Sequence, residues 1–183
     1  MVGLHVARAV TTVLRPVTLA DVPVLAPFAA EAFDAAFGPL YRPDDLGLFL
    51  DEYRTEKAYR DALAEPAKRI QLAEIDGKAV AYSLIVLGDG MSERPPPQPA
   101  RPVFLSQLYC AAEATGHGLG AALMDWAIGE AHAWRADAIQ LSVFSENFGA
   151  QRFYQRYGFR KVADIDFWVG NHRDDEFLYE LAL

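Results

Sequence analysis

The sequence predicts a single α/β domain in which a mixed, mostly antiparallel sheet is flanked by helices. Its 183 residues are enough for one continuous core and too few for two domains of ordinary size. Near the middle of the chain, an apolar run of strand length leads through a glycine-rich loop into a helical pattern. Further runs with strand character precede and follow this unit, which predicts one sheet with helices packed on it.

The N-terminal part predicts one strand and then a helix. Thr12 to Arg15 has strand character, and the helix that follows can be capped by Thr18 or Asp21. The helix is expected to end near Gly38 and Pro39. Its apolar residues recur at helical spacing: Val24, Leu25, Phe28, Ala29, Ala32 and Phe33.

A second helical region runs from Pro43 towards Leu63, with a break expected near 53–56. Asp44 and Asp45 lie in its first turn, where negative charge favours the helix dipole. The region is rich in large side chains, which either wall a binding site or fill the core: Tyr41, Leu46, Phe49, Leu50, Tyr53 and Tyr59.

A β-hairpin and a long loop follow. Ile70 to Ile75 and Val80 to Leu87 are strands, and the Asp-Gly pair between them is typical of a tight hairpin turn. The segment from Gly88 to Pro102 contains five of the eleven prolines, so neither a core strand nor a helix can run through it. It is expected to be an exposed loop that either shapes the mouth of a site or has no chemical role.

The central unit predicts an anion-binding site. Val103 to Cys110 is a strand, the loop after it contains Gly116, Gly118 and Gly120, and a helix begins near Leu119. Glycines let the backbone approach a ligand closely, and the first turn of a helix has unpaired N–H groups that favour phosphate. The helix is expected to bury Leu119, Ala122, Leu123, Trp126 and Ala127, and to expose Asp125, Gly129 and His132.

The last third of the chain continues the sheet. Ala138 to Phe144 is apolar enough for a buried strand parallel to the central one. Asn147 caps a helix that ends at Gly158. The segments 159–169 and 177–183 close the sheet as antiparallel strands, and the acidic cluster between them is expected to be a solvated turn: Asp174, Asp175 and Glu176.

Composition excludes several classes of partner. A net charge of −8 disfavours nucleic acid and anionic membranes, and it favours a cationic small substrate. One cysteine precludes an internal disulfide and suits a cytoplasmic protein. No apolar run approaches the length of a membrane span, and the four histidines have no metal-ligand spacing, so no metal is expected. The arginines before Asp21 suggest either a transit peptide or a ragged terminus, and the second is favoured.

Two motifs together resemble the GNAT superfamily of acetyl-coenzyme-A-dependent N-acetyltransferases. The glycine loop is the first, and the second is N-x-x-A-x-x-F-Y-x-x-x-G-F. The second motif is formed by Asn147, Ala150, Phe153, Tyr154, Gly158 and Phe159. The resemblance implies a sheet whose central parallel strand pair is splayed, and first helices that help to wall the acceptor side. It also implies a small-molecule primary amine as acceptor, more faintly a polyamine, and a homodimer as a common state.

The resemblance assigns roles to particular residues. Tyr154 would donate a proton to the departing sulfur of coenzyme A, as a phenol that is protonated at neutral pH. Asn147 would orient either the cofactor or only the start of its helix. The main chain of Leu108, Tyr109 and Cys110 would bind the pantetheine arm and the thioester carbonyl. The pyrophosphate would lie on the loop formed by Thr115, Gly116, His117, Gly118, Leu119, Gly120 and Ala121.

The sequence departs from the family pattern at two points. Thr115 stands where the loop usually begins with Arg or Gln, which weakens pyrophosphate binding unless Arg101 or another cation reaches in. The central strand also lacks the glutamate that is the general base in many relatives. Glu113 is the nearest carboxylate in sequence but is expected to be solvated, and a water relay is the alternative. Cys110 is expected to be a small core residue and not a nucleophile.

Two other classes of protein remain as alternatives. A catalytically silent acyl-coenzyme-A sensor would keep the glycine loop, and the absence of an obvious base favours it. A nicotinamide-dependent Rossmann enzyme would share the looser pattern of Gly116, Gly118 and Ala121. It is disfavoured because five residues separate the strand from the first glycine.

Overall fold

The computed structural model describes residues 11–183, which form a seven-stranded sheet in the order β1-β2-β3-β4-β5-β7-β6. The strands are β1 (Thr12–Pro16), β2 (Lys68–Ile75), β3 (Lys78–Leu87), β4 (Pro102–Cys110), β5 (Ala138–Phe144), β6 (Arg160–Val169) and β7 (His172–Ala182). The helices are α1 (Val22–Phe37), α2 (Pro43–Tyr53), α3 (Glu56–Ala64), α4 (Leu119–Ala133) and α5 (Phe148–Arg156). Short 3-10 turns occupy Leu19–Asp21, Gly38–Leu40 and Ala112–Ala114.

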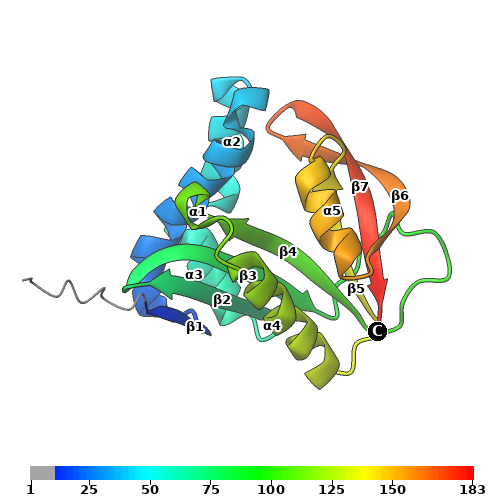
Figure 1. Ribbon diagram of the computed structural model, residues 1–183. Helices are drawn as coiled ribbons and strands as arrows, with labels where there is room; N and C mark the ends of the chain where they lie inside the picture. The colour runs from blue at the N-terminus through cyan, green and yellow to red at the C-terminus, as the bar shows by residue number, and fades with distance from the viewer. Residues whose placement is uncertain (1–10) are drawn as a thin grey trace, which may run out of the picture.

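The predicted fold class is confirmed. β4 and β5 are parallel, and every other neighbouring pair in the sheet is antiparallel. The helices α4 and α5 cover one face of the sheet and α1 and α3 the other, while α2 stands beside the β6–β7 turn (Figure 1). A sheet with a single parallel pair is not the doubly wound Rossmann sheet, so the nicotinamide alternative is wrong at the level of fold.

The central strands separate within a few residues. β4 and β5 pair only at Pro102↔Ala138, Val103↔Ile139 and Phe104↔Gln140. Directly after this pairing, β4 contains a β-bulge, because Leu84 pairs with Gln107 and Ile85 with Leu105, which leaves Ser106 unpaired. A bulge bends its strand and increases the local twist. The bulge therefore accounts for the parting of β4 from β5, which opens the sheet at its centre.

Most local predictions are confirmed, and the predicted start of the last strand is wrong. Asp76 and Gly77 both have positive φ, at 49° and 80°, as a tight hairpin turn of this type requires. Val24 is 57% exposed and does not belong to the buried face of α1, whereas Met124 of α4 is fully buried. Strand β7 begins at His172, five residues earlier than expected. The acidic cluster is therefore strand and not turn.

The proline-rich segment is an exposed loop, as predicted, and it packs away from the centre of the sheet. Arg94 forms an ion pair with Glu180 at 2.8 Å, and the backbone N–H of Met91 donates to the buried Gln140 side chain at 2.7 Å. None of the residues 88–101 lines the central cavity described below. Asp89, at the start of the loop, lines a neighbouring pocket that shares Tyr53, Phe104, Ser106 and Gln107 with that cavity. The two roles left open for this loop therefore both stay predictions.

Gly170 in the β6–β7 turn brings that turn against the start of α2. Its φ is +57°, and a Cβ added there would lie 2.6 Å from Asp45 Cα. The next residue, Asn171, donates its backbone N–H to Asp45 Oδ1 at 2.8 Å. This contact fixes α2 against the sheet, because no side chain fits between the two segments.

We expect Gly170→Ala to lower the free energy of unfolding by roughly 2–5 kcal/mol, the sum of left-handed strain and overpacking. Gly77→Ala is the matched control, since Gly77 also has positive φ but a Cβ there would meet nothing within 4 Å. The control should lose only about 1–2 kcal/mol. Chemical denaturation of both variants measures the difference. Equal losses would contradict the close contact at Asp45.

Candidate active site

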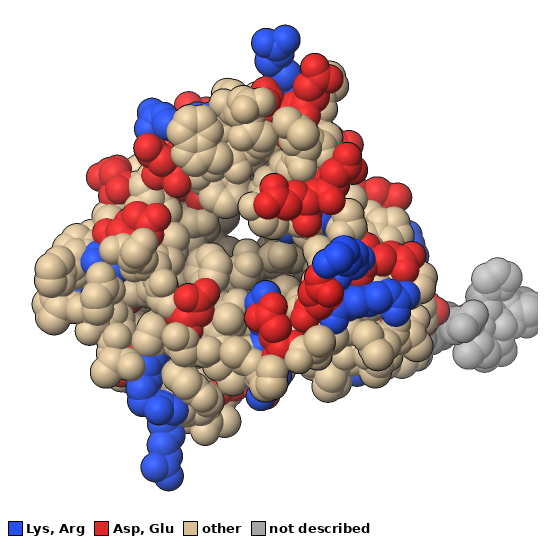
Figure 2. Space-filling view, turned by 180° about the vertical axis from the view of Figure 1, so that it is seen from behind, with Lys and Arg blue, Asp and Glu red and all other residues tan. Residues whose placement is uncertain are grey.

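A cavity of about 370 Å³ lies where β4 and β5 part. Residues from α1, α2, β4, β5, α5, β6 and β7 line it, so segments from both halves of the chain meet there. Figure 2 shows an opening near the centre of the face opposite to that in Figure 1, with acidic side chains around it. The cavity walls are mainly aromatic and include Phe33, Phe37, Phe49, Tyr109, Phe167 and Trp168.

The aromatic walls are packed against each other. The rings of Phe33 and Phe49 stack with their centroids 4.5 Å apart, and Phe167 meets Phe49 edge-on at 5.9 Å. Of the aromatic residues that the sequence left open between a binding wall and core filler, Tyr41 and Tyr53 line the cavity, as Phe49 does. Tyr59 is 1% exposed and belongs to the core. Both interpretations of the aromatic region are therefore correct, each for different residues.

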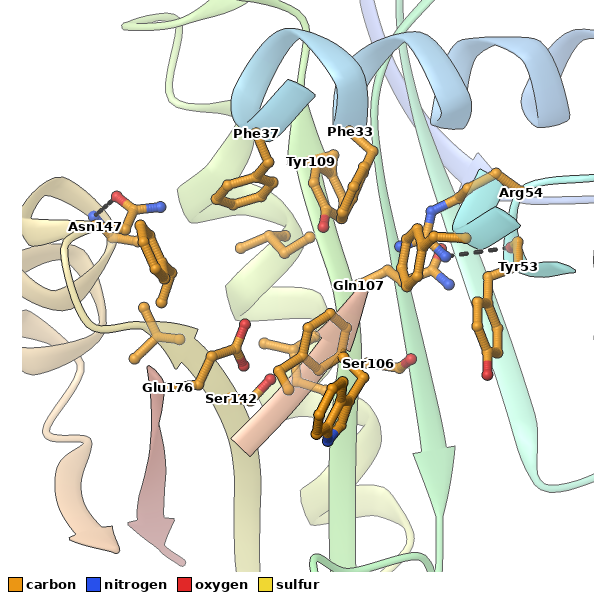
Figure 3. A pocket seen from close by; sticks show the side chains of 18 of the residues that line it. Phe33, Phe37, Tyr53, Arg54, Ser106, Gln107, Tyr109, Ser142, Asn147 and Glu176 are labelled. Carbon is orange, nitrogen blue, oxygen red and sulfur yellow. Dashed lines mark hydrogen bonds between the residues drawn. The ribbon is translucent and has the colours of Figure 1, made fainter. Parts of the chain in front are cut away.

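Glu176 of β7 carries a buried carboxyl group that points into the cavity (Figure 3). Its Oε2 atom has no hydrogen-bond partner among residues 11–183. Burial raises the pKa of Glu176 to about 7, the nearby Ser142 hydroxyl lowers it in part, and the negative charge of Asp174 raises it further. A carboxyl group with this pKa is half ionised near neutral pH, which is the property of an effective general base.

Asp174 is buried beside this site and has partners. It accepts a hydrogen bond from the Tyr41 hydroxyl at 2.5 Å, and its other oxygen lies 3.2 Å from His172 Nε2. The sequence-based prediction of a solvated turn at 174–176 is wrong for two of its three residues, since Asp174 and Glu176 are 5% and 9% exposed. The physical reason is that this segment is a strand paired with β5 and β6, and its alternate residues Asp174, Glu176 and Leu178 lie on a buried face.

Tyr154 and Asn147 come to the cavity from α5 and its N-terminus. Asn147 caps the helix, because its Oδ1 accepts from the Ala150 backbone N–H at 3.0 Å, and the predicted N-cap is confirmed. Tyr154 lines the cavity, and burial raises the pKa of its hydroxyl above the ordinary value of 10. Tyr109 and Glu176 are among the groups that raise this pKa further. The phenol thus keeps its proton throughout the neutral range.

Arg54 is the second buried charge in the cavity wall. It follows the last residue of α2, within the predicted break between the two helices, and is 8% exposed. Neither Arg54 nor Glu176 was predicted from the sequence as a residue of the site. Alternation extended backwards from Leu178 would have placed Glu176 on a buried face of β7, whereas an arginine in a helix break carries no such signal.

The glycine loop lies at the N-terminus of α4, next to the cavity but outside its lining. Gly116 and Gly118 have φ of 86° and 75°. The Thr115 and His117 N–H groups pair within the loop, at 3.2 and 3.4 Å, but the Gly116 and Gly118 N–H groups have no backbone partner among residues 11–183. The first turn of α4 adds the unpaired donors of a helix start. Outward-facing amides are thus available here.

The other residues predicted to bind the cofactor lie at the end of β4 and the start of α4. Leu108 and Tyr109 line the cavity, while Cys110 is partly buried and packs near Gly120 of α4. Burial raises the pKa of the Cys110 thiol, which is opposite to what a nucleophile needs. The side chain of Leu119 is buried, so only its main chain can face a ligand. Ala121 accepts from the Tyr157 hydroxyl at 3.2 Å.

Two charged groups that the sequence offered are not at the site. Glu113 is exposed and paired with Lys78 at 3.1 Å, as its predicted solvated role requires. Arg101 binds the carbonyl oxygens of Trp134 and Arg135 at the far end of α4, so it does not compensate for Thr115 in the glycine loop. Thr115 itself donates to the Ala111 carbonyl at 3.3 Å.

Residues 11–183 contain no cluster of three or more side chains suited to hold a metal ion. Within the same residues, no helix is long and apolar enough to cross a membrane.

Comparison with known proteins gives a consistent result. The model of the acetyltransferase (GNAT) family matches residues 34–159. An uncharacterized N-acetyltransferase of Mycobacterium tuberculosis (strain ATCC 25618 / H37Rv) is 31% identical over 160 residues, which are 87% of this chain and 96% of that protein. One of Lactobacillus delbrueckii subsp. lactis is 25% identical over 163 residues, 89% of this chain and 92% of that protein.

Solved structures share the fold at low sequence identity. The PaiA N-acetyltransferase from Thermoplasma acidophilum, in complex with coenzyme A, superposes with a TM-score of 0.75 at 16% identity, over 94% of this chain and 99% of that chain. Naa50 from Arabidopsis thaliana, in complex with the bisubstrate analogue CoA-Ac-MVNAL, superposes with a TM-score of 0.65 at 19% identity. The superposition covers 94% of this chain and 99% of that chain.

Proposed function

Because the chain belongs to the GNAT acetyltransferase family and is an acyltransferase, we propose that it transfers an acetyl group from acetyl-coenzyme A to a small-molecule primary amine. The amine attacks directly in a ternary complex. The observation that carries this proposal is the cavity at the parted strands, where the proton acceptor Glu176 and the proton donor Tyr154 both line one space. Attack by an amine and departure of a thiolate need these two functions.

The residues present fit the acyl donor. Beyond Phe104, the edge of β4 that faces β5 has no strand partner among residues 11–183, so the main chain of Leu108 to Cys110 is free to bind a pantetheine arm. The unpaired amides at Gly116, Gly118 and the first turn of α4 would hold the diphosphate. Thr115 and His117 belong to the same loop, and Asn147 would orient the donor near Tyr154.

Acetyl-coenzyme A would supply a thioester acyl group that is activated towards amines. Glu176 would accept the proton of the ammonium form, directly or through water, and so deliver the neutral amine. The neutral amine would form the new C–N bond at the thioester carbonyl as the C–S bond breaks, and Tyr154 would donate its hydroxyl proton towards the departing sulfur. The second proton that the nitrogen loses as the amide forms would return to Tyr154, directly or through water. Because Glu176 acts as its carboxylate and has a pKa of about 7, activity should require pH values near or above 7. Burial raises the pKa of Tyr154 above 10, so its donor function persists through that range.

The sequence-based alternative, a silent acyl-coenzyme-A sensor, rested on the absence of a base. Glu176 supplies a candidate base, which favours an active enzyme. Other expectations stay predictions: a polyamine as acceptor, a cytoplasmic location, a homodimer, and the absence of a metal. One cysteine and a net charge of −8 support the location and the cationic character of the acceptor group.

A thiol-release assay with acetyl-coenzyme A and a panel of primary amines tests the proposed function. We expect release of coenzyme A that depends on the amine, together with binding of coenzyme A in calorimetry. Binding without release for any amine would support the sensor. Absence of binding would overturn both functions, since both need the glycine loop and the open edge of β4.

A further inference from the structure

Arg54 is a buried cation without a counterion in the cavity wall. Within residues 11–183, Nη1 of the guanidinium donates to the Tyr53 carbonyl at 3.2 Å, and Nε has no partner. The Tyr109 hydroxyl lies close enough to interact with the guanidinium as well, but it is a neutral group and not a counterion. Among residues 11–183, the two other arginines that are partly shielded from solvent are paired with carboxylates, Arg15 with Glu74 and Arg94 with Glu180. A buried charge normally has such a partner, because desolvation without one is costly.

Three aromatic rings surround the guanidinium. The Arg54 Cζ atom lies 5.4 Å from the ring centroid of Phe33, 5.2 Å from that of Phe49 and 5.8 Å from that of Tyr109. Such contacts lower the cost of burying the cation. They do not satisfy its N–H donors, which lie in the plane of the group. These donors match the two oxygens of a planar carboxylate.

Glu176 lies across the cavity from Arg54, with Tyr109 between them (Figure 3). The two charged groups do not form an ion pair with each other, and each has an atom that lacks a hydrogen-bond partner among residues 11–183. One cavity therefore presents a positive group on one wall and a carboxyl group on another. The rest of the lining includes the rings of Phe33, Phe49 and Phe167.

We propose that the acceptor is a zwitterion of the amino acid class, whose carboxylate pairs with Arg54 while its amine faces Glu176. This inference rests on the proposed acetyltransferase function and names its acceptor. The cavity of about 370 Å³ accommodates a molecule of amino acid size, and its aromatic walls suit an apolar or aromatic side chain. A zwitterion also agrees with the acidic surroundings of the opening, which would repel an acceptor of net negative charge.

Arg54 argues against a polyamine as the preferred acceptor. The second and third ammonium groups of such a molecule would meet a buried cation that carries no counterion. Like charges in a low-dielectric site repel strongly. A simple amine without a carboxylate would bind with the Arg54 donors still unpaired, which also costs affinity.

Matched pairs of acceptors test the inference. We expect kcat/KM for phenylalanine to exceed that for phenethylamine, and kcat/KM for leucine to exceed that for isoamylamine, by on the order of 100-fold or more. Spermidine should be a poor acceptor. Equal or better turnover of the decarboxylated amines, or turnover of spermidine alone, would overturn the inference and leave the acetyltransferase function intact.

Variants of Arg54 test whether this residue causes the preference for acceptors that carry a carboxylate. In Arg54→Gln, the preference for phenylalanine over phenethylamine should fall to within a few-fold of unity, and Arg54→Lys should retain part of it. Arg60→Gln is the control, since Arg60 is an exposed arginine on α3 that pairs with Glu56. It should keep the full preference. An unchanged preference in Arg54→Gln would overturn the assignment, and the ratio is readable even if the variant is less stable.

A binding measurement tests the carboxylate site at Arg54 separately from the acetyltransferase function. In the presence of coenzyme A, phenylalanine should raise the Tm of the wild-type protein more than phenethylamine does. Such a shift without any acetyl transfer would refute the enzymatic function and support the carboxylate site. Acetyl transfer to amines, without a larger Tm shift for phenylalanine than for phenethylamine, would support the enzymatic function and refute the carboxylate site.

Discussion

Glu176→Gln is expected to lower kcat/KM at pH 7 by about 10²–10⁴-fold, the usual contribution of a general base. The variant keeps the shape of the side chain and removes the proton-accepting carboxylate. Its affinity for coenzyme A, measured by calorimetry, should stay within a few-fold of wild type, because the proposed donor site lies on β4 and the glycine loop. Asp175→Asn is the matched control, since Asp175 is the exposed neighbour that pairs with Arg173.

The pH profile distinguishes a base from a merely structural carboxyl group. In the wild type, kcat/KM should rise about tenfold per pH unit up to the pKa of Glu176, about 7, and then level off. In Glu176→Gln, it should continue to rise until the pKa of the amine itself, so that activity recovers at alkaline pH. Parallel profiles for the two proteins would contradict the role of Glu176. Asp174, Tyr41, Tyr109 and Tyr154 are the other titratable groups near this carboxyl group.

Glu176→Gln is also expected to change the pH dependence of the free energy of unfolding. The pKa of Glu176 is raised from 4.5 in the unfolded chain to about 7 in the folded protein. Protonated Glu176 therefore contributes fully to the free energy of unfolding below pH 4.5, and this contribution is lost as the pH rises through 7. Ionised Glu176 therefore costs about 3 kcal/mol at alkaline pH. Glu176→Gln should unfold at a higher denaturant concentration than wild type at pH 8 and at a similar one at pH 5.

Tyr154→Phe is expected to lower kcat by about 10²-fold, while the dissociation constant for coenzyme A changes by less than a few-fold. The expected loss lies at the lower end for a general acid. Burial raises the Tyr154 pKa above that of a thiol, so full transfer of the proton to the thiolate is uphill. Its hydrogen bond to the charge that develops on sulfur should contribute most of the effect.

Tyr157→Phe is the matched control for Tyr154→Phe. It removes a hydroxyl from the same helix end, but this hydroxyl donates to the Ala121 carbonyl of α4 at 3.2 Å and Tyr157 does not line the cavity. The control should change kcat by no more than a few-fold. Single-turnover measurements with each variant separate the chemical step from product release. Full activity of Tyr154→Phe would remove the proton donor from the mechanism.

The sequence determined the elements and their order because their signals are local. An Asp-Gly pair with positive φ fixes the hairpin between β2 and β3, Asn147 caps α5 through its own side chain, and glycines mark the start of α4. Such features depend on a few neighbouring residues, so they can be predicted without knowledge of the rest of the fold. The family resemblance of the segment 103–159 was readable for the same reason.

Only the tertiary structure decided which charges are in the active site. Its position in an acidic run led to the prediction that Glu176 is solvated, although alternation with Leu178 indicates a buried face. Arg54 lies in a helix break, which carries no signal of burial. In the folded chain β7 is covered on one face, and the end of α2 is pressed against the sheet, so both side chains are buried. The free-energy cost of burying a charge depends on the groups that distant segments place around it. Here these groups are aromatic side chains from α1, α2, β4 and β6. Alternation along β7 indicates a buried face for Glu176, but no pattern within one segment reveals which groups surround Glu176 or that Arg54 is buried.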